Sequence, residues 1–99
     1  MLGLFSAQKR RREAFEREAL PHLDALHAYA LHLCRSPADA EDLVQETFLR
    51  AVKSLPSFRG EVPVQAWLLS IARRVCADDV RRRQRARRLA ERLERVAVT

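Results

Sequence analysis

The sequence predicts an all-α protein, a compact bundle of three to four helices. Only two of its 99 residues are glycine, and no stretch alternates apolar and polar residues for long, as an amphipathic strand would. Apolar residues make up 47% and charged residues 32% of the chain, a composition typical of a folded domain rather than of a disordered one. A chain of this length supports one domain with one modest core.

The first third of the chain predicts an arm followed by a helical region. Residues 1–11 show no clear period, so we expect a loosely ordered arm there and a helical domain over residues 12–88. The first helical region is expected from about Glu13 to Cys34. Pro21 lacks a backbone donor and therefore either kinks this region or begins a new helix in its first turn. The buried stripe is expected to comprise Ala19, Leu20, Leu23, Leu26, Ala30, Leu31 and Cys34.

A strong helix start follows at Ser36. This serine is expected to be the N-cap, with Pro37 at the first helical position and Asp39 close to the positive end of the helix dipole. The helix should continue to about Ser54 or Leu55. Its core side is expected to comprise Leu43, Val44, Thr47, Phe48, Ala51 and Leu55.

Leu49 interrupts the polar side of this helix. At 100° per residue, its neighbours on the helix surface are Asp42, Gln45, Glu46 and Lys53. A single exposed leucine usually has no function. A leucine inside an acid-rich patch can also be part of a binding site for a partner protein. The residues alone leave both interpretations open.

The last part of the chain predicts a loop and a long third helix. Pro and Gly make Pro56 to Val62 a loop, and a helix begins near Pro63 and runs past Arg81. Residues 89–99 are expected to be a frayed helix end, a continuation of the helix or the start of an interdomain linker. The buried stripe of the helix is expected to comprise Val64, Trp67, Leu68, Ile71, Ala72 and Val75. The opposite side, with Ser70, Arg73, Arg74, Ala77, Arg81 and Gln84, is basic and suits a phosphate backbone.

Charge is distributed unevenly along the chain. There are 19 Lys plus Arg against 13 Asp plus Glu, a formal net charge of +6. Arg81 to Arg95 contains eight Arg and two Glu, whereas Ser36 to Val62 contains five acids and three bases. A basic end and an acidic middle indicate two partners of opposite charge, one of them nucleic acid. The alternative is that the Arg-rich helix end is simply solvated.

No pattern predicts catalysis, a metal site or a cofactor, so we expect a protein that is not an enzyme. His22, His27 and His32 are five residues apart and do not share a helix face as an i, i+4 metal pair would. The glycines, Gly3 and Gly60, do not form a phosphate-binding loop. Neighbouring Asp78 and Asp79 diverge by about 100° on a helix, which argues against a carboxylate pair. Asp78 is expected either to pair with Arg74 or Arg82 at i, i+4 or to face DNA.

Cysteine usage and hydropathy bear on the compartment. Cys34 and Cys76 form no CxxC motif and lie among apolar neighbours, so we expect small buried thiols in a reducing cytoplasm. No stretch approaches the roughly 20 apolar residues that span a bilayer, and there is no recognisable signal peptide. We therefore expect no membrane partner and a cytoplasmic protein.

Two stretches carry a resemblance to a known family. The run SPADAEDLVQETFLRAV, followed after a Phe-containing loop by AWLLSIARRVCADDVRRRQR, closely resembles region 2 of bacterial extracytoplasmic-function (ECF, group 4) sigma factors of the sigma-70 family. The resemblance covers roughly Phe15 to Arg88. It implies a helical module for transcription initiation that docks on core RNA polymerase and recognises and melts the promoter minus-ten element. A module of this kind would be associated with the nucleoid during initiation.

The resemblance also implies two binding surfaces. The surface for the coiled coil of the beta-prime subunit would comprise Asp39, Asp42, Leu43, Gln45, Glu46 and Leu49, with Phe48 and Val52 mainly holding the helix in place. The surface for the non-template strand of the minus-ten element would comprise the loop Ser57 to Val62, which contains Phe58, Arg59 and Gly60, together with Ser70, Arg73, Arg74, Asp78, Arg81 and Arg82. A loop of this composition can hold an unstacked base, while the arginines hold the backbone. Phe58 could equally close the loop as part of the core, and Trp67 is expected to be chiefly a core residue.

Two features differ from the family pattern. Many members have Asn where this chain has Arg74, so the residue here either reads a different base or binds only phosphate. The second family domain, a helix-turn-helix for the minus-thirty-five element, has no counterpart in the sequence. We expect a fragment of a longer sigma factor, the alternative being a stand-alone protein with partial promoter recognition. An anti-sigma protein is a further partner that the resemblance suggests. The rival functions are a helical DNA-binding protein or a protein-interaction module that acts without polymerase.

Overall fold

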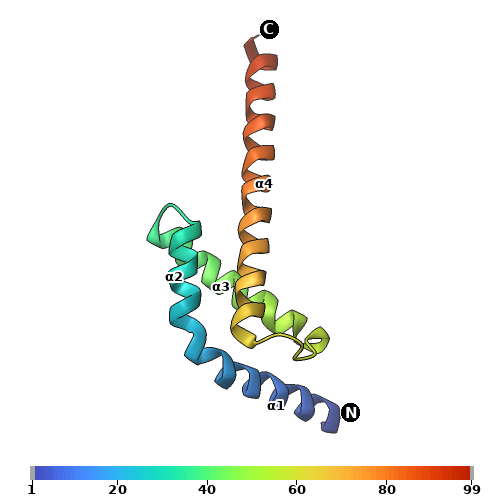
Figure 1. The fold of residues 1–99 in the computed structure, drawn as a ribbon. Helices are drawn as coiled ribbons and strands as arrows, with labels where there is room; N and C mark the ends of the chain where they lie inside the picture. The colour runs from blue at the N-terminus through green and yellow to red at the C-terminus, as the bar shows by residue number, and fades with distance from the viewer. Residues whose placement is uncertain (1, 99) are drawn as a thin grey trace.

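The computed structural model describes residues 2–98, apart from the side chains of Leu2, Leu4 and Phe5, and these residues form an all-α fold (Figure 1). The elements in chain order are α1 (Leu2–Ala19), the 3₁₀ turn η1 (Leu20–His22), α2 (Leu23–Leu33), α3 (Pro37–Ser54), the 3₁₀ turn η2 (Leu55–Ser57) and α4 (Val64–Val98). No strand occurs in this part of the chain. The all-α prediction is confirmed.

The core lies where α2, α3 and the first half of α4 pack on one another. Alanines with no exposed surface, Ala30, Ala40, Ala51 and Ala72, let the helix backbones approach closely. Larger side chains fill the space between them, chiefly Leu26, Leu43, Val64, Leu68, Ile71 and Val75. Thr47 is the buried polar residue of the core, and its hydroxyl donates to the Leu43 carbonyl at 2.7 Å, so its burial leaves no donor unsatisfied. The expected core sides of α3 and α4 are thereby confirmed.

Two helix boundaries follow from the residues that predicted them. The Ser36 hydroxyl accepts a hydrogen bond from the Asp39 backbone N–H at 3.1 Å, and Pro37 is the first residue of α3. Pro21 lies in η1, which separates α1 from α2, so it starts a new helix rather than kinking one.

The buried stripe of the first helical region differs from its prediction at two leucines. Leu20 is 58% exposed and Leu31 is 43% exposed. Leu20 is the first residue of the 3₁₀ turn η1, whereas Leu26 and Leu31 both belong to α2, so the period of α2 alone separates them. Counted from Leu26, the stripe of α2 then continues through Ala30 to Leu33, while Leu31 points about 140° away.

The N-terminal end of the chain is more helical than expected, and the C-terminal end follows one of the expected alternatives. Residues 2–11 belong to α1, although we expected a loosely ordered arm, and the Arg11 guanidinium donates to the Leu55 carbonyl at 3.2 Å. Phe15 and Ala19 anchor the same helix in the core. Residues 89–98 continue α4, whose second half extends away from the bundle (Figure 1). Within the described residues, no helix is both long enough and apolar enough to cross a membrane.

Candidate functional surfaces on α3 and α4

Four of the six residues expected to face polymerase form one exposed side of α3. Asp42, Gln45, Glu46 and Leu49 are exposed, and we call these four residues the acidic face. Leu49 is 59% exposed, so its side chain is not needed for the core. The structure therefore leaves an apolar side chain accessible among carboxylate and amide groups.

The other two residues expected on that surface lie elsewhere. Leu43 is only 6% exposed and belongs to the core. Asp39 is half-buried, and its Oδ1 lies 3.8 Å from Nη2 of Arg83 on α4. Leu43 is thus unavailable in this conformation, and Asp39 faces the helix crossing rather than the open side of α3.

A row of cationic side chains lies on the outer side of α4. Arg73, Arg74 and Arg81 are exposed, as the helical period predicted, and we call these three residues the arginine row. Ser70 is exposed on the same side of the helix. The Ser70 hydroxyl donates to the Trp67 carbonyl at 2.6 Å. Neither Arg73 nor Arg74 forms an ion pair with any residue that the structure describes. Their guanidinium groups are therefore available to an external anion.

The loop before α4 contains an aromatic stack. The Phe58 ring stacks on Trp67 with 4.4 Å between ring centroids and 22° between planes, and Trp67 meets Phe15 edge to face at 5.7 Å. Phe58 and Trp67 are both half-buried against the core. The structure thus shows Phe58 in the closing role that the sequence left open. Arg59 and Gly60 are exposed, and the φ of +73° at Gly60 explains the glycine at this turn.

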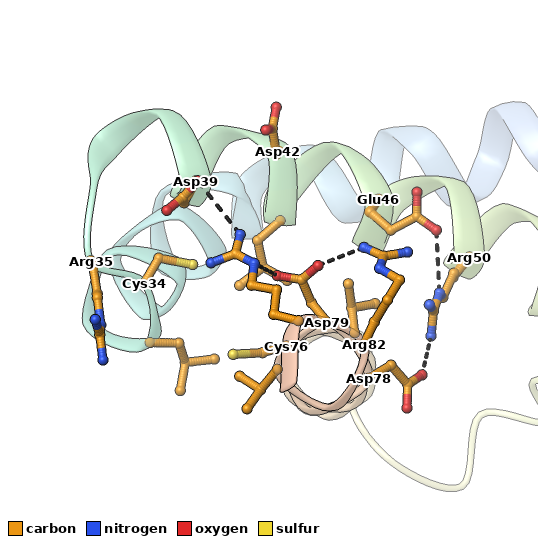
Figure 2. A pocket seen from close by; sticks show the side chains of 15 residues that line it. Cys34, Arg35, Asp39, Asp42, Glu46, Arg50, Cys76, Asp78, Asp79 and Arg82 are labelled. Carbon is orange, nitrogen blue, oxygen red and sulfur yellow. Dashed lines mark hydrogen bonds and ion pairs between the residues drawn. The ribbon is translucent and has the colours of Figure 1, made fainter. Parts of the chain in front are cut away.

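One side of the crossing between α3 and α4 is held by a chain of charges (Figure 2). Arg50 of α3 donates from Nε to Glu46 Oε1 at 3.3 Å and from Nη1 to Asp78 Oδ2 at 3.0 Å. The second Asp78 oxygen accepts from Arg81 at 2.5 Å. These hydrogen bonds lower the pKa of the Asp78 carboxyl, first through Arg50 and then through Arg81, and the Asp78 bond raises the pKa of Arg50.

The ion pairs of Asp78 differ from the expected ones. Its partners are Arg50 and Arg81, not Arg74 or Arg82, because α3 supplies a cation across the helix crossing and the i, i+3 neighbour reaches the remaining oxygen. Arg82, which was also expected to face DNA, instead donates to Asp79 at 2.5 Å. Its side chain nevertheless remains 74% exposed.

The same side of the crossing forms a groove between the end of α2, α3 and α4, and Glu46, Arg50 and Asp78 line one end of it (Figure 2). Arg83 lies 2.9 Å from Asp79 and 3.8 Å from Asp39, and so links α4 to the first turn of α3. Cys34 and Cys76 line this groove as half-buried free thiols (Figure 2). Burial is the first cause that raises the pKa of the Cys34 thiol, followed by the neighbouring Cys76. The cysteines were expected to be buried, and they are only partly so.

Sequence reasoning missed three residues that organise this region: Arg50, Asp79 and Arg83. Arg50 follows the three- and four-residue period of the polar side of α3, and that period alone predicts a side chain that faces water. Its partner on α4 is 28 positions away in sequence. No helical period shows such a pair, since it depends on how α3 and α4 cross.

Comparison with known proteins identifies the family of the chain. Residues 20–86, more than half of the chain, match the family described as Sigma-70 region 2. The chain belongs to the sigma-70 region 2 family.

Its relatives specify the type. The chain is 38% identical over 68 residues to the ECF RNA polymerase sigma factor EcfG of Rhodopseudomonas palustris, covering 69% of this chain and 38% of that protein. It is 39% identical over 75 residues to SigG of Mycobacterium tuberculosis, covering 76% of this chain and 20% of that protein. A match to the ECF factor SigC of the same species has 52% identity over 42 residues, covering 42% of this chain and 23% of that protein. The chain is therefore of the ECF type, and it spans well under half the length of these relatives.

Proposed function

We propose that the chain is a transcription-initiation module that docks on core RNA polymerase and recognises and melts the minus-ten element of a promoter. The observation that carries this proposal is the separation of two accessible surfaces of opposite character on two crossing helices. The acidic face of α3 presents Leu49, and the arginine row of α4 presents Arg73 and Arg74, which form no ion pair with any described residue. The family of the chain supports this assignment.

The acidic face suits the coiled coil of the polymerase beta-prime subunit. An accessible apolar side chain ringed by polar and charged groups matches the layout of a protein interface, which has an apolar centre and a polar rim. Asp39 would join this surface only if its 3.8 Å pair with Arg83 opened. Leu43 would support it from the core side. An anti-sigma protein is a second proposed partner of the same accessible residues.

The arginine row and the preceding loop suit the non-template strand. Arg73, Arg74 and Arg81 would hold phosphates, and Arg59 with Gly60 would allow the strand to approach the loop. Because Phe58 already stacks on Trp67, it would contribute by extending that aromatic pair toward a base. Melting needs a binding site for an unstacked base, and we propose that this loop provides it. The module would bind and position while the polymerase supplies the catalysis, and it would act in the cytoplasm.

Polymerase docking is tested with a leucine pair of matched exposure. Leu49→Ser and Leu20→Ser remove similar side chains, which are 59% and 58% exposed. We expect Leu49→Ser to weaken binding to core polymerase in a pull-down or by biolayer interferometry, and Leu20→Ser to leave it unchanged. Gln45→Ala should act in the same direction as Leu49→Ser. Unchanged binding by both acidic-face variants would show that this face does not dock polymerase.

DNA binding is tested with an arginine pair. Arg73→Ala should weaken binding to single-stranded DNA carrying a minus-ten sequence and should flatten the dependence of affinity on salt concentration, because one phosphate contact is lost. Arg35→Ala removes an exposed arginine from the groove side of the crossing and serves as the control. Equal losses of DNA affinity in the two variants would mean that Arg73 acts only through nonspecific charge and that the arginine row is not a specific DNA-binding surface.

The rival functions give different outcomes in the same assays. A helical DNA-binding protein that acts without polymerase would lose DNA affinity with Arg73→Ala but show no polymerase binding at all. A protein-interaction module would bind a protein through the acidic face and show no dependence on Arg73. The accessible Leu49 is left unexplained by the first rival, and the unpaired arginines by the second.

A further inference from the structure

The residue Arg50 joins two helices through a single guanidinium group. It belongs to α3, its side chain is 39% exposed, and it donates to Glu46 on its own helix and to Asp78 on α4 at 3.0 Å (Figure 2). Glu46 is a member of the acidic face, and Asp78 lies beside the arginine row. One cation therefore serves an acid on each of the two surfaces.

The position of Asp78 creates a problem for a DNA-binding surface. Its side chain is 48% exposed and lies at the edge of a row of cations that face outward. A carboxylate there repels an approaching phosphate, and it also ties up Arg81 through the 2.5 Å hydrogen bond. A second cation, Arg50 on the other oxygen Oδ2, reduces both effects, because it offsets the carboxylate charge that repels phosphate and attracts Arg81.

We propose that Arg50 is a positioning residue of the DNA surface, contributed by α3, which neutralises Asp78 and so leaves Arg81 able to bind phosphate. This inference rests on the proposed function of the arginine row. Arg50 acts through Asp78 and does not itself touch the strand. Glu46 accepts from the same guanidinium at 3.3 Å, so it competes with Asp78 for Arg50.

The expected effect is modest because the groups are exposed to solvent and exposed ion pairs are weak. Arg50→Met keeps the length and the apolar stem of the side chain and removes its charge. We expect this change to weaken the affinity for single-stranded DNA about three- to five-fold, in line with the loss of one screened charge interaction. Glu46→Gln removes the competitor, and we expect affinity to rise by up to about two-fold, since Arg50 then serves Asp78 alone.

The deciding experiment is a double-mutant cycle between Arg50 and Asp78. The affinity of the chain for a fluorescein-labelled single-stranded DNA of about 12 nucleotides, a length within the usual site sizes, is measured by fluorescence anisotropy. Four proteins are compared: wild type, Arg50→Met, Asp78→Asn, and the double variant. We expect Arg50→Met to weaken binding in the wild-type background and to have no effect in the Asp78→Asn background, where no carboxylate remains to be neutralised.

A direct contact between Arg50 and phosphate would give a different result. In that case Arg50→Met would weaken binding equally in both backgrounds, and the inference would be wrong. The Glu46→Gln variant gives an independent check, because its gain in affinity should vanish when Arg50 is already Met. A gain that persists would mean that Glu46 acts on DNA through space and not through Arg50.

Two controls separate this inference from folding and from the proposed function. Arg50→Lys keeps the charge but has a single donor group, so partial recovery relative to Arg50→Met is expected, and circular dichroism establishes that each variant is helical. Arg50→Gln replaces Arg50→Met if the latter does not fold. If Arg73→Ala also leaves DNA affinity unchanged, the proposed DNA surface itself fails. If Arg73→Ala weakens binding while the cycle is additive, only the role of Arg50 fails.

Discussion

Leu68 and Leu49 allow the same chemical change to be made once in the core and once on a proposed interface. Leu68 belongs to α4, is 1% exposed and packs into the core, whereas Leu49 on α3 is 59% exposed. Truncating a buried leucine to alanine removes its transfer free energy and leaves a cavity, at a cost of about 2.7–5 kcal/mol in the free energy of unfolding. For a domain of this size, each kcal/mol corresponds to about 4–8 °C in Tm.

We therefore expect Leu68→Ala to lose about 3–4 kcal/mol of stability and Leu49→Ala to lose less than about 0.5 kcal/mol. The assay is urea unfolding followed by circular dichroism at the helical band, with polymerase binding measured on the same samples at a temperature where both variants are folded. Leu49→Ala should lose polymerase affinity at nearly unchanged stability, and Leu68→Ala should show the reverse. A stability loss at Leu49 comparable to that at Leu68 would mean that Leu49 is a packing residue, and the reasoning that separates it from the core would be refuted.

Three further outcomes are expected. Ser36→Ala should cost about 1 kcal/mol because it removes the acceptor for the Asp39 N–H, whereas Ser36→Asp should retain most of that stability in urea unfolding. The lowered pKa of the Asp78 carboxyl stabilises the fold at pH values above the ordinary Asp pKa of about 3.9, and this contribution is lost as the pH falls through the lower folded-state pKa. The Tm difference between wild type and Asp78→Asn should therefore be present at neutral pH and disappear in acid. A Tm difference that persists in acid would contradict this. Backbone amides of α4 beyond Arg83 should exchange with deuterium much faster than those near Leu68, because residues 84–98 are exposed to solvent. Uniform protection along α4 would contradict this.

Helix starts and core sides could be read from the sequence because they depend on local chemistry. Ser36 and Pro37 mark the start of α3, and Pro21 marks the break between α1 and α2. The apolar period likewise identified the buried sides of α3 and α4, and with them the exposure of Leu49. These features need no knowledge of how the helices cross.

The features that escaped prediction depend on tertiary arrangement. Which leucines of α2 are buried depends on the side that packs against α3 and α4, and this packing exposes Leu31 and half-buries Leu33. Whether Phe58 meets a base or the core is decided by the approach of Trp67, a contact set by the path of the loop. The pairing of Asp78 with Arg50 requires α3 to cross α4 at one particular place.

This crossing has a consequence for how the two surfaces can be probed. Residues in the charge network, such as Glu46 and Asp78, each touch a group that also serves the other surface. A substitution there changes the charge environment of both surfaces at once, so a loss of binding does not identify which surface was damaged. Leu49 is uncharged, and Arg73 forms no ion pair with any described residue, so both lie outside the network. Their substitution therefore perturbs one surface only. The docking and DNA-binding assignments should therefore be decided with Leu49 and Arg73, and the network residues should be interpreted only through double-mutant cycles.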